Sequence, residues 1–160
     1  MPHTSTHLYR AIKNGSFPGD VFVVDDEPAA GLLYPRFEAT TYVDGEGREQ
    51  VSQADVTVTG DKVQPGGGTS MFNVRGWFGF THWAYFHVPE GTEYPSGLFI
   101  KKGRSKRTNK SKTLTGFHYQ IEPKNPMTVD AFKGALDNFA RNALVQQIAQ
   151  AKGGLTTERT

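Results

Sequence analysis

The sequence predicts an α+β fold that is rich in short strands and ends in one helix packed on the sheet. Its 160 residues include 18 glycines and nine prolines, which favour many turns and short strands over long helices. Only residues 125–154 carry a sustained helical pattern. Because this length fits one compact core, residues 1–160 are predicted to form a single domain.

The first predicted element is a strand at residues 7–12, with the sequence HLYRAI. Side chains alternate along a strand, so Arg10 shares a face with Leu8 and Ile12. The glycine- and proline-containing turn NGSFPGD follows directly and ends the strand. An early arginine is therefore expected beside apolar groups.

The middle of the chain is turn-rich, and strands are predicted there at residues 37–43 and 51–60. Three consecutive glycines then precede Thr69 and Ser70, which open the segment TSMF. The aromatic-rich residues 76–89 are typical of a buried strand or a pocket wall.

Residues 115–123, TGFHYQIEP, alternate between apolar and polar side chains, as a half-buried strand does. The apolar set is expected to face the core: Phe117, Tyr119 and Ile121. The polar set leaves on the other face: His118, Gln120 and Glu122. One side of this strand thus carries three groups able to bind or to catalyse.

The helix is predicted to begin after Thr128, a residue type that caps helix N-termini, and to end before Gly153. Four apolar residues recur at steps of four, three and four and predict the face that packs on the sheet: Phe132, Leu136, Phe139 and Ala143.

Basic residues are concentrated in one stretch, although the net charge is only +2. Residues 101–112, KKGRSKRTNKSK, contain seven of the 18 lysines and arginines and no acid. Rich in serine, asparagine and glycine, this stretch is predicted to be a mobile loop between two strands. It is also a candidate contact for nucleic acid, although no aromatic residue within it could stack on a base.

Several classes of site are excluded or weakened by the sequence. The absence of cysteine excludes disulfides, thiolate metal sites and a cysteine nucleophile. The glycines at 66–68 lack the lysine of a phosphate loop, and we expect no metal site. A hydrolase using Ser70 and His118 stays a weak alternative, because the Gly-x-Ser-x-Gly turn is absent. Neither a secretory signal nor a membrane span is evident, so a cytoplasmic protein, including one delivered into a target cell, is expected.

Three segments together resemble a known toxin family: LYRA, GGTSMF, and HYQIEP leading into PMTVDAFKGALDNFARNAL. The family is the type VI secretion effector called type six exported effector two, whose fold looks like that of mono-ADP-ribosyltransferase toxins. The resemblance covers residues 7–18 and 66–150, including VPEGTEYP and LDNFARNA, and is weak over 20–60.

The resemblance implies a cytotoxin that uses NAD as a substrate, with an arginine on an early strand, a serine or threonine opening a middle strand, and a glutamine or glutamate on a late strand. The matching catalytic candidates are Arg10, Ser70, His118 and Gln120. The matching NAD-binding candidates are Arg10, Gly68, Thr69, Ser70, Tyr119 and Glu122. These side chains are expected to face one cleft, and a cognate immunity protein is a candidate partner.

The substrate explains such a set of residues. A guanidinium can hold the NAD pyrophosphate through two parallel hydrogen bonds, which suits Arg10. Bond cleavage develops positive charge on the ribose, so acceptor oxygens from Gln120 or Glu122 are expected beside it. Aromatic rings of Trp77, Phe80, Trp83 or Tyr119 are candidates to stack on nicotinamide.

The late strand departs from the family pattern of two glutamates separated by one residue, since it reads His118, Gln120 and Glu122. Transfer of ADP-ribose to a target, NAD hydrolysis and binding without turnover all stay open at this point. The alternative from another class is a non-catalytic domain that binds nucleic acid or protein through residues 101–112.

Overall fold

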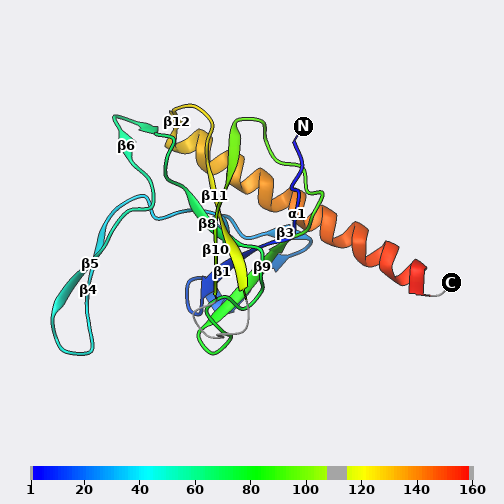
Figure 1. The fold of residues 1–160 in the computed structure, drawn as a ribbon, viewed down its shortest axis with the longest axis horizontal. Coiled ribbons are helices and arrows are strands. Elements are labelled where there is room, and N and C mark those ends of the chain that lie inside the picture. The colour runs from blue at the N-terminus through cyan, green and yellow to red at the C-terminus, as the bar shows by residue number, and fades with distance from the viewer. Residues whose placement is uncertain (1, 108–114, 159–160) are drawn as a thin grey trace.

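A computed structural model describes residues 2–107 and 115–158 of the chain. Its main sheet has five antiparallel strands in the order β10-β11-β8-β1-β9. Their bounds are Leu8–Lys13 (β1), Thr69–Phe72 (β8), Trp83–Val88 (β9), Leu98–Arg107 (β10) and Thr115–Pro123 (β11). β10 and β9 are the two edges, and β8 lies in the middle (Figure 1).

Short strands fill the part of the chain between β1 and β8. They are β2 (Val23–Val24), β3 (Glu27–Pro28), β4 (Thr40–Val43), β5 (Glu49–Ser52), β6 (Val58–Thr59) and β7 (Lys62–Val63), with β12 (Met127–Thr128) pairing on β7. A short 3-10 helix, η1, spans Pro18–Asp20. The β4–β5 hairpin projects away from the rest of the molecule (Figure 1). Many turns and few long elements follow from the glycine and proline content.

The helix α1 spans Val129–Glu158 and lies along one side of the sheet, with its C-terminal part running past the sheet (Figure 1). Thr128 caps it as predicted, because its Oγ1 accepts a hydrogen bond from the Ala131 amide at 3.1 Å. The predicted end at Gly153 is wrong, since the helix continues to Glu158. Glycine lowers helix stability without forbidding helix, so it did not end the element here.

The core lies between this helix and the sheet face that carries Met71, Tyr119 and Ile121, called the core face below. All four predicted helix residues are fully buried: Phe132, Leu136, Phe139 and Ala143. Burying a phenylalanine or leucine side chain contributes about 1.5–3 kcal/mol, so this contact accounts for much of the stability. The predicted α+β fold with a helix packed on the sheet is confirmed.

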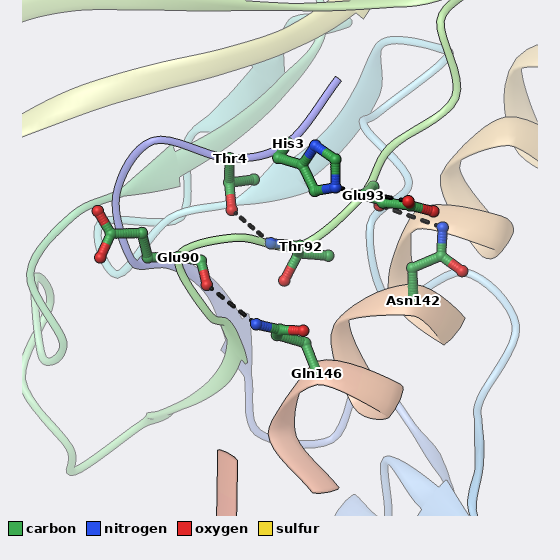
Figure 2. A network of polar contacts seen from close by, with 7 residues as sticks. All are labelled: His3, Thr4, Glu90, Thr92, Glu93, Asn142 and Gln146. Carbon is green, nitrogen blue, oxygen red and sulfur yellow. Dashed lines mark hydrogen bonds and ion pairs between the residues drawn. The ribbon is translucent and has the colours of Figure 1, made fainter. Parts of the chain in front are cut away.

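The N-terminal segment is hydrogen-bonded to the turn after β9, and the helix is hydrogen-bonded to the same turn (Figure 2). Thr4 Oγ1 donates to the Pro89 carbonyl at 2.8 Å and accepts from the Thr92 amide at 3.0 Å. From the helix, Asn142 and Gln146 donate their side-chain amides to the carbonyls of Glu93 and Glu90 (Figure 2). These contacts fix where β1 begins, and therefore where Arg10 lies in the sheet.

Two sequence predictions about strands are corrected by the structure. Residues 51–60 do not form one strand, because β5 ends at Ser52 and β6 begins at Val58. The aromatic stretch 76–89 is a strand only from Trp83, and its first half is a turn. Alternation predicted the strand at 51–60, whereas aromatic content predicted a buried strand or a pocket wall at 76–89. Neither signal shows whether a neighbouring strand is present to pair with.

The predicted loop at 101–112 is also wrong in its first half. Residues 101–107 continue β10 and pair with β11, from Lys101 opposite Gln120 to Arg107 opposite Thr115. Residues 108–112 lie outside the described part of the chain. Charge and low hydrophobicity suggested a loop, but an edge strand exposed to water accommodates lysines readily.

Within the described residues, no helix combines the length and apolar character needed to cross a bilayer.

Candidate functional site

Side chains of three adjacent strands form a row on the sheet face opposite the core. Gln120 of β11 lies directly opposite Ser70 of β8 and also opposite Lys101 of β10. Paired residues in an antiparallel ladder point to the same face, so all three leave the sheet together. His118 is opposite Phe72 and shares this face, which is called the site face below. The predicted neighbourhood of Ser70, Gln120 and His118 is therefore present.

β1 and β8 separate next to this row, and Arg10 lies where they part. Among the described residues, the two strands pair at one position, Tyr9 opposite Phe72. Arg10 is opposite Phe86 of β9, which is buried, so its side chain leaves β1 on the core face. Its Nη1 then donates to the Ser70 carbonyl at 3.0 Å, and its Nη2 donates to the Tyr34 carbonyl at 2.9 Å. The guanidinium thus takes the place of ladder hydrogen bonds that the diverging strands no longer make.

The Arg10 guanidinium is a fixed positive charge with a spare donor. Its Nε is buried and has no hydrogen-bond partner within the described structure. Burial lowers the pKa of Arg10, the Asp55 carboxylate opposes this, and the nearby Arg36 guanidinium adds to the lowering. An arginine nevertheless stays protonated in proteins, so a partly buried cation with an open donor remains at this point. Such an arrangement favours an anionic ligand.

Tyr34 links Arg10 to the helix. The Tyr34 hydroxyl donates to Asp137 Oδ2 of α1 at 2.6 Å, while its carbonyl accepts from Arg10. Burial raises the pKa of Tyr34 to about 12, and the hydrogen bond and negative charge of Asp137 act in the same direction. The tyrosine therefore stays protonated and keeps donating at physiological pH, which holds the Arg10 anchor in place.

A cavity of about 240 Å³ opens at the point where β1 and β8 separate. Its lining combines two guanidinium groups, one carboxylate, one hydroxyl and aromatic rings: Arg10, Ala11, Arg36, Asp55, Ser70, Phe72, Phe78 and Trp83. A second cavity of about 410 Å³ adjoins it and shares Arg10, Ala11, Arg36 and Trp83 with it. Ligand pockets typically measure roughly 300–1,000 Å³, so the two adjoining cavities offer room for a molecule larger than one ring.

Gln120 and His118 line a neighbouring cavity of about 290 Å³, together with Gly66, Lys101 and Gly103. The Gln120 amide nitrogen donates to Glu122 Oε2 at 3.0 Å and to the Gly66 carbonyl at 3.3 Å. These bonds orient the side chain and leave its carbonyl oxygen as the acceptor. Gln120 is opposite Ser70 in the ladder, so this cavity and the Arg10 cavity border adjacent strands of the sheet, although they share no lining residue.

Other predicted site residues lie elsewhere. Thr69 is fully buried and donates to the Leu33 carbonyl at 2.6 Å on the core face. Tyr119 is also on the core face, where it lines a separate cavity of about 190 Å³. Glu122 is 7% exposed and lines neither site-face cavity. The structure places Arg10 and Ser70 in one cavity and His118 and Gln120 in another, rather than in one shared cleft, and these three residues line neither cavity.

Gly68 has a role that the sequence did not indicate. A Cβ atom at Gly68 would lie 1.8 Å from the Ile121 carbonyl oxygen. The glycine therefore lets β8 approach β11, which brings Ser70 opposite Gln120. Gly68 thus acts through the backbone of the sheet, whereas the sequence predicted that it would approach a ligand closely.

Arg36, Asp55, Phe72 and Phe78 line the cavity but were missed in the sequence. Arg36 lies in a turn-rich part of the chain, and Asp55 lies within residues 51–60, which were predicted as a strand. The two meet because the Arg36 amide donates to Asp55 Oδ2 at 2.6 Å. Of the ring residues considered from the sequence, Trp83 lines the cavity, whereas Trp77 is buried against Phe72.

Comparisons with known proteins identify the family of this chain. Residues 5–148 match a family model described as the Tse2 ADP-ribosyltransferase toxin. The chain is 32% identical over 160 residues to Toxin Tse2 of Pseudomonas aeruginosa, and the match covers 94% of this chain and 95% of that protein. The resemblance stated from the sequence is confirmed. The chain therefore belongs to the Tse2 family of ADP-ribosyltransferase toxins.

Proposed function

We propose that this toxin binds NAD where β1 and β8 separate and along the adjoining site face, and cleaves its bond to nicotinamide, with transfer of ADP-ribose to a target or to water. The observation that carries the proposal is the Arg10 guanidinium, held at the parting of β1 and β8 with one buried donor unused. Family membership supports the same chemistry.

The pyrophosphate of NAD is assigned to Arg10 and Arg36. Both guanidinium groups line the two adjoining cavities, and Asp55 is the acidic residue beside them. Two cations and one anion leave a net positive site, which suits a dianionic pyrophosphate. Arg36 is anchored through a hydrogen bond from its Nη1 to the Gln53 carbonyl at 3.0 Å, so it is partly preorganised.

Aromatic side chains supply the walls for a flat ring. Phe78 and Trp83 stack on each other with ring centroids 4.7 Å apart, and both line the Arg10 cavity. Such surfaces bind nicotinamide or adenine through stacking and exclusion of water. Trp83 is our candidate for the ring contact, because it lines both adjoining cavities.

Ser70 and Gln120 are assigned to the ribose next to nicotinamide. As the bond from ribose C1′ to nicotinamide breaks, nicotinamide leaves as a neutral molecule with the bonding electrons. The acceptor atom then bonds to C1′ and loses its proton. The Gln120 carbonyl and the Ser70 hydroxyl can hold ribose hydroxyls while positive charge develops on the sugar. His118 lines the same cavity as Gln120 and is our candidate to take the acceptor proton.

Release of nicotinamide from NAD by the purified toxin is the direct test. We expect release above the uncatalysed rate with the unaltered chain, and its loss in the variants described in the Discussion. A folded toxin that neither binds NAD nor releases nicotinamide would overturn the proposal.

Replacing Arg36 with alanine is expected to weaken NAD binding with little change in stability. The residue is exposed, and the substitution removes a charge-assisted phosphate contact worth about 1.5–3 kcal/mol, or roughly ten- to hundredfold in affinity. Calorimetric titration with NAD measures the effect. Arg48→Ala is the matched control. Arg48 lies in the turn of the β4–β5 hairpin and forms an exposed ion pair with Glu46. Equal affinities of the two variants would contradict the assignment of Arg36.

Replacing Arg10 with alanine is expected to lower both NAD affinity and stability. The guanidinium satisfies the carbonyls of Ser70 and Tyr34, so its loss should cost roughly 2–3 kcal/mol in the free energy of unfolding. Arg10→Lys should recover part of the stability but little of the affinity, because an ammonium group cannot span both carbonyls and a phosphate. Melting curves and NAD titrations of both variants measure this. An unchanged melting temperature and an unchanged NAD affinity for Arg10→Ala would contradict the assignment of Arg10 to the NAD site.

A further inference from the structure

The edge strand β10 presents a basic surface beside the proposed NAD site. Residues 101–104 are all exposed, and the sequence from 101 to 112 contains seven lysines and arginines without an acid. An edge strand with lysines also resists pairing with other sheets, which is the ordinary explanation of such charge. Two further features of β10 are not accounted for by that explanation.

The first feature is an aromatic ring next to a lysine on the site face. Phe99 is opposite Glu122, and Lys101 is opposite Gln120, so both side chains leave the sheet on the site face. The Phe99 ring is 45% exposed, although burial would be the favourable state for it. Residues two apart in a strand are separated by roughly 6.5 Å, so Phe99 and Lys101 occupy successive positions on the same face. Residues 101–112 contain no aromatic side chain, but Phe99, two residues before Lys101, provides one on the same face.

The second feature is a bulge that brings the edge strand to the Gln120 cavity. The register between β10 and β11 shifts between Lys102 and Ser105. Gly103 lies at this shift, and a Cβ there would be 2.9 Å from the His118 carbonyl oxygen. Bulges redirect side chains beside functional sites. Here Lys101 and Gly103 line the same cavity as Gln120 and His118.

Lys102, the next residue along β10, points to the opposite face of the sheet from Lys101. It is opposite the buried Tyr119, and its Nζ lies 4.1 Å from the centroid of the Phe117 ring. It lines the separate cavity on the core face. Two adjacent lysines with the same charge and similar exposure therefore point to opposite faces of one strand.

We propose that Phe99 and Lys101 form a docking strand for single-stranded nucleic acid, with a base stacked on the Phe99 ring and a phosphate held by Lys101. Positive charge combined with an exposed ring is the combination that binds single strands. A duplex would leave the ring unused, because its bases are stacked on each other, and an acidic peptide offers no base for the ring.

This position makes nucleic acid the class of acceptor for ADP-ribose, a conclusion that rests on the proposed function above. Lys101 faces Gln120, so a nucleotide held on β10 would place its neighbour at the cavity of Gln120 and His118. The acceptor atom of the transfer would then be a base nitrogen or an oxygen of the nucleic acid, with its proton released as described above.

Binding is tested first, without NAD, with short labelled single-stranded DNA and RNA at several salt concentrations. Lys101→Gln should reduce the slope of log affinity against log salt by about 0.7, the value of one phosphate contact on a single strand. Lys102→Gln should leave that slope nearly unchanged. Equal effects of the two substitutions, or no binding by the unaltered toxin, would overturn the docking strand.

The ring is tested in the same assay. Phe99→Ala should weaken binding on the order of tenfold, since base stacking on an aromatic residue contributes substantially to single-strand affinity. Tyr42→Ala is the matched control, because Tyr42 is 51% exposed on the β4–β5 hairpin, away from β10. Affinity for duplex DNA equal to that for single strands would also contradict the stacked base.

The acceptor is tested by adding NAD and measuring both nicotinamide release and the mass of the oligonucleotide. A mass increase of one ADP-ribose is expected. Nicotinamide release with an unmodified oligonucleotide would overturn the acceptor assignment and leave the proposed NAD site intact. Lys101-dependent binding without nicotinamide release would overturn the proposed function and leave the docking strand intact.

Discussion

Alanine at position 120 is expected to slow nicotinamide release by about a hundredfold to a thousandfold, the usual effect of removing a preorganised group that stabilises developing charge. Gln120 is oriented by hydrogen bonds from its amide nitrogen to Glu122 and to the Gly66 carbonyl, so its acceptor oxygen is fixed. The loss in stability should stay within about 1–2 kcal/mol, because Glu122 loses one donor. Initial rates of nicotinamide release, together with melting curves, measure both effects.

The neighbouring pair Thr69 and Ser70 provides the control for this result. Ser70→Ala should lower the rate as Gln120→Ala does, since Ser70 faces Gln120 across the ladder. Thr69→Val should instead cost about 1–2 kcal/mol of stability through the lost bond to Leu33 and leave the rate unchanged. If Gln120→Ala and Ser70→Ala both kept full rates, the row on the site face would be an ordinary solvent-exposed strand face.

Alanine at position 68 is expected to have the largest effect on stability. The new methyl group would lie 1.8 Å from the Ile121 carbonyl oxygen and 3.1 Å from the Glu122 Cα, and backbone atoms cannot yield as a flexible side chain does. β8 and β11 would have to separate, at a cost of about 3 kcal/mol or more. Thermal unfolding should shift downward by about 10 °C.

Gly134→Ala is the matched control for this substitution. Gly134 lies in α1 with nothing within 4 Å of its would-be Cβ, so alanine there should raise stability by up to about 1 kcal/mol. If Gly68→Ala left both the melting temperature and the rate of nicotinamide release unaltered, β8 and β11 would not be held as closely together at Gly68 as the structure shows.

The sequence predicted the elements whose pattern is local. Residues 115–123 alternate strictly, and β11 has those bounds. The helix face was predicted because its four apolar residues repeat with the helical period, and all four are buried. Family resemblance placed Arg10, Ser70 and Gln120 on three separate strands, and the sheet brings these strands side by side.

Strand register and pairing partners could not be predicted, because they depend on contacts between residues far apart in the chain. One residue of register decides that Ser70 and Gln120 share the site face while Thr69 and Tyr119 share the core face. Arg36 and Asp55 reach the Arg10 cavity from segments that form no strand, and the alternation of residues 51–60 predicted a strand there instead of a site residue.

The sequence by itself determined the fold class, the family and the residue types available for chemistry, since these depend on composition, periodicity and short motifs. The tertiary structure decided which of those residues meet. Arg10 meets Ser70 because β1 and β8 part after Tyr9 and Phe72, which leaves the Ser70 carbonyl to the guanidinium. The same guanidinium also binds the Tyr34 carbonyl from the segment between β3 and β4. Lys101 and Lys102 differ only in the face that the ladder with β11 gives them, and that pairing is fixed by the burial of Tyr119 and Ile121 in the core.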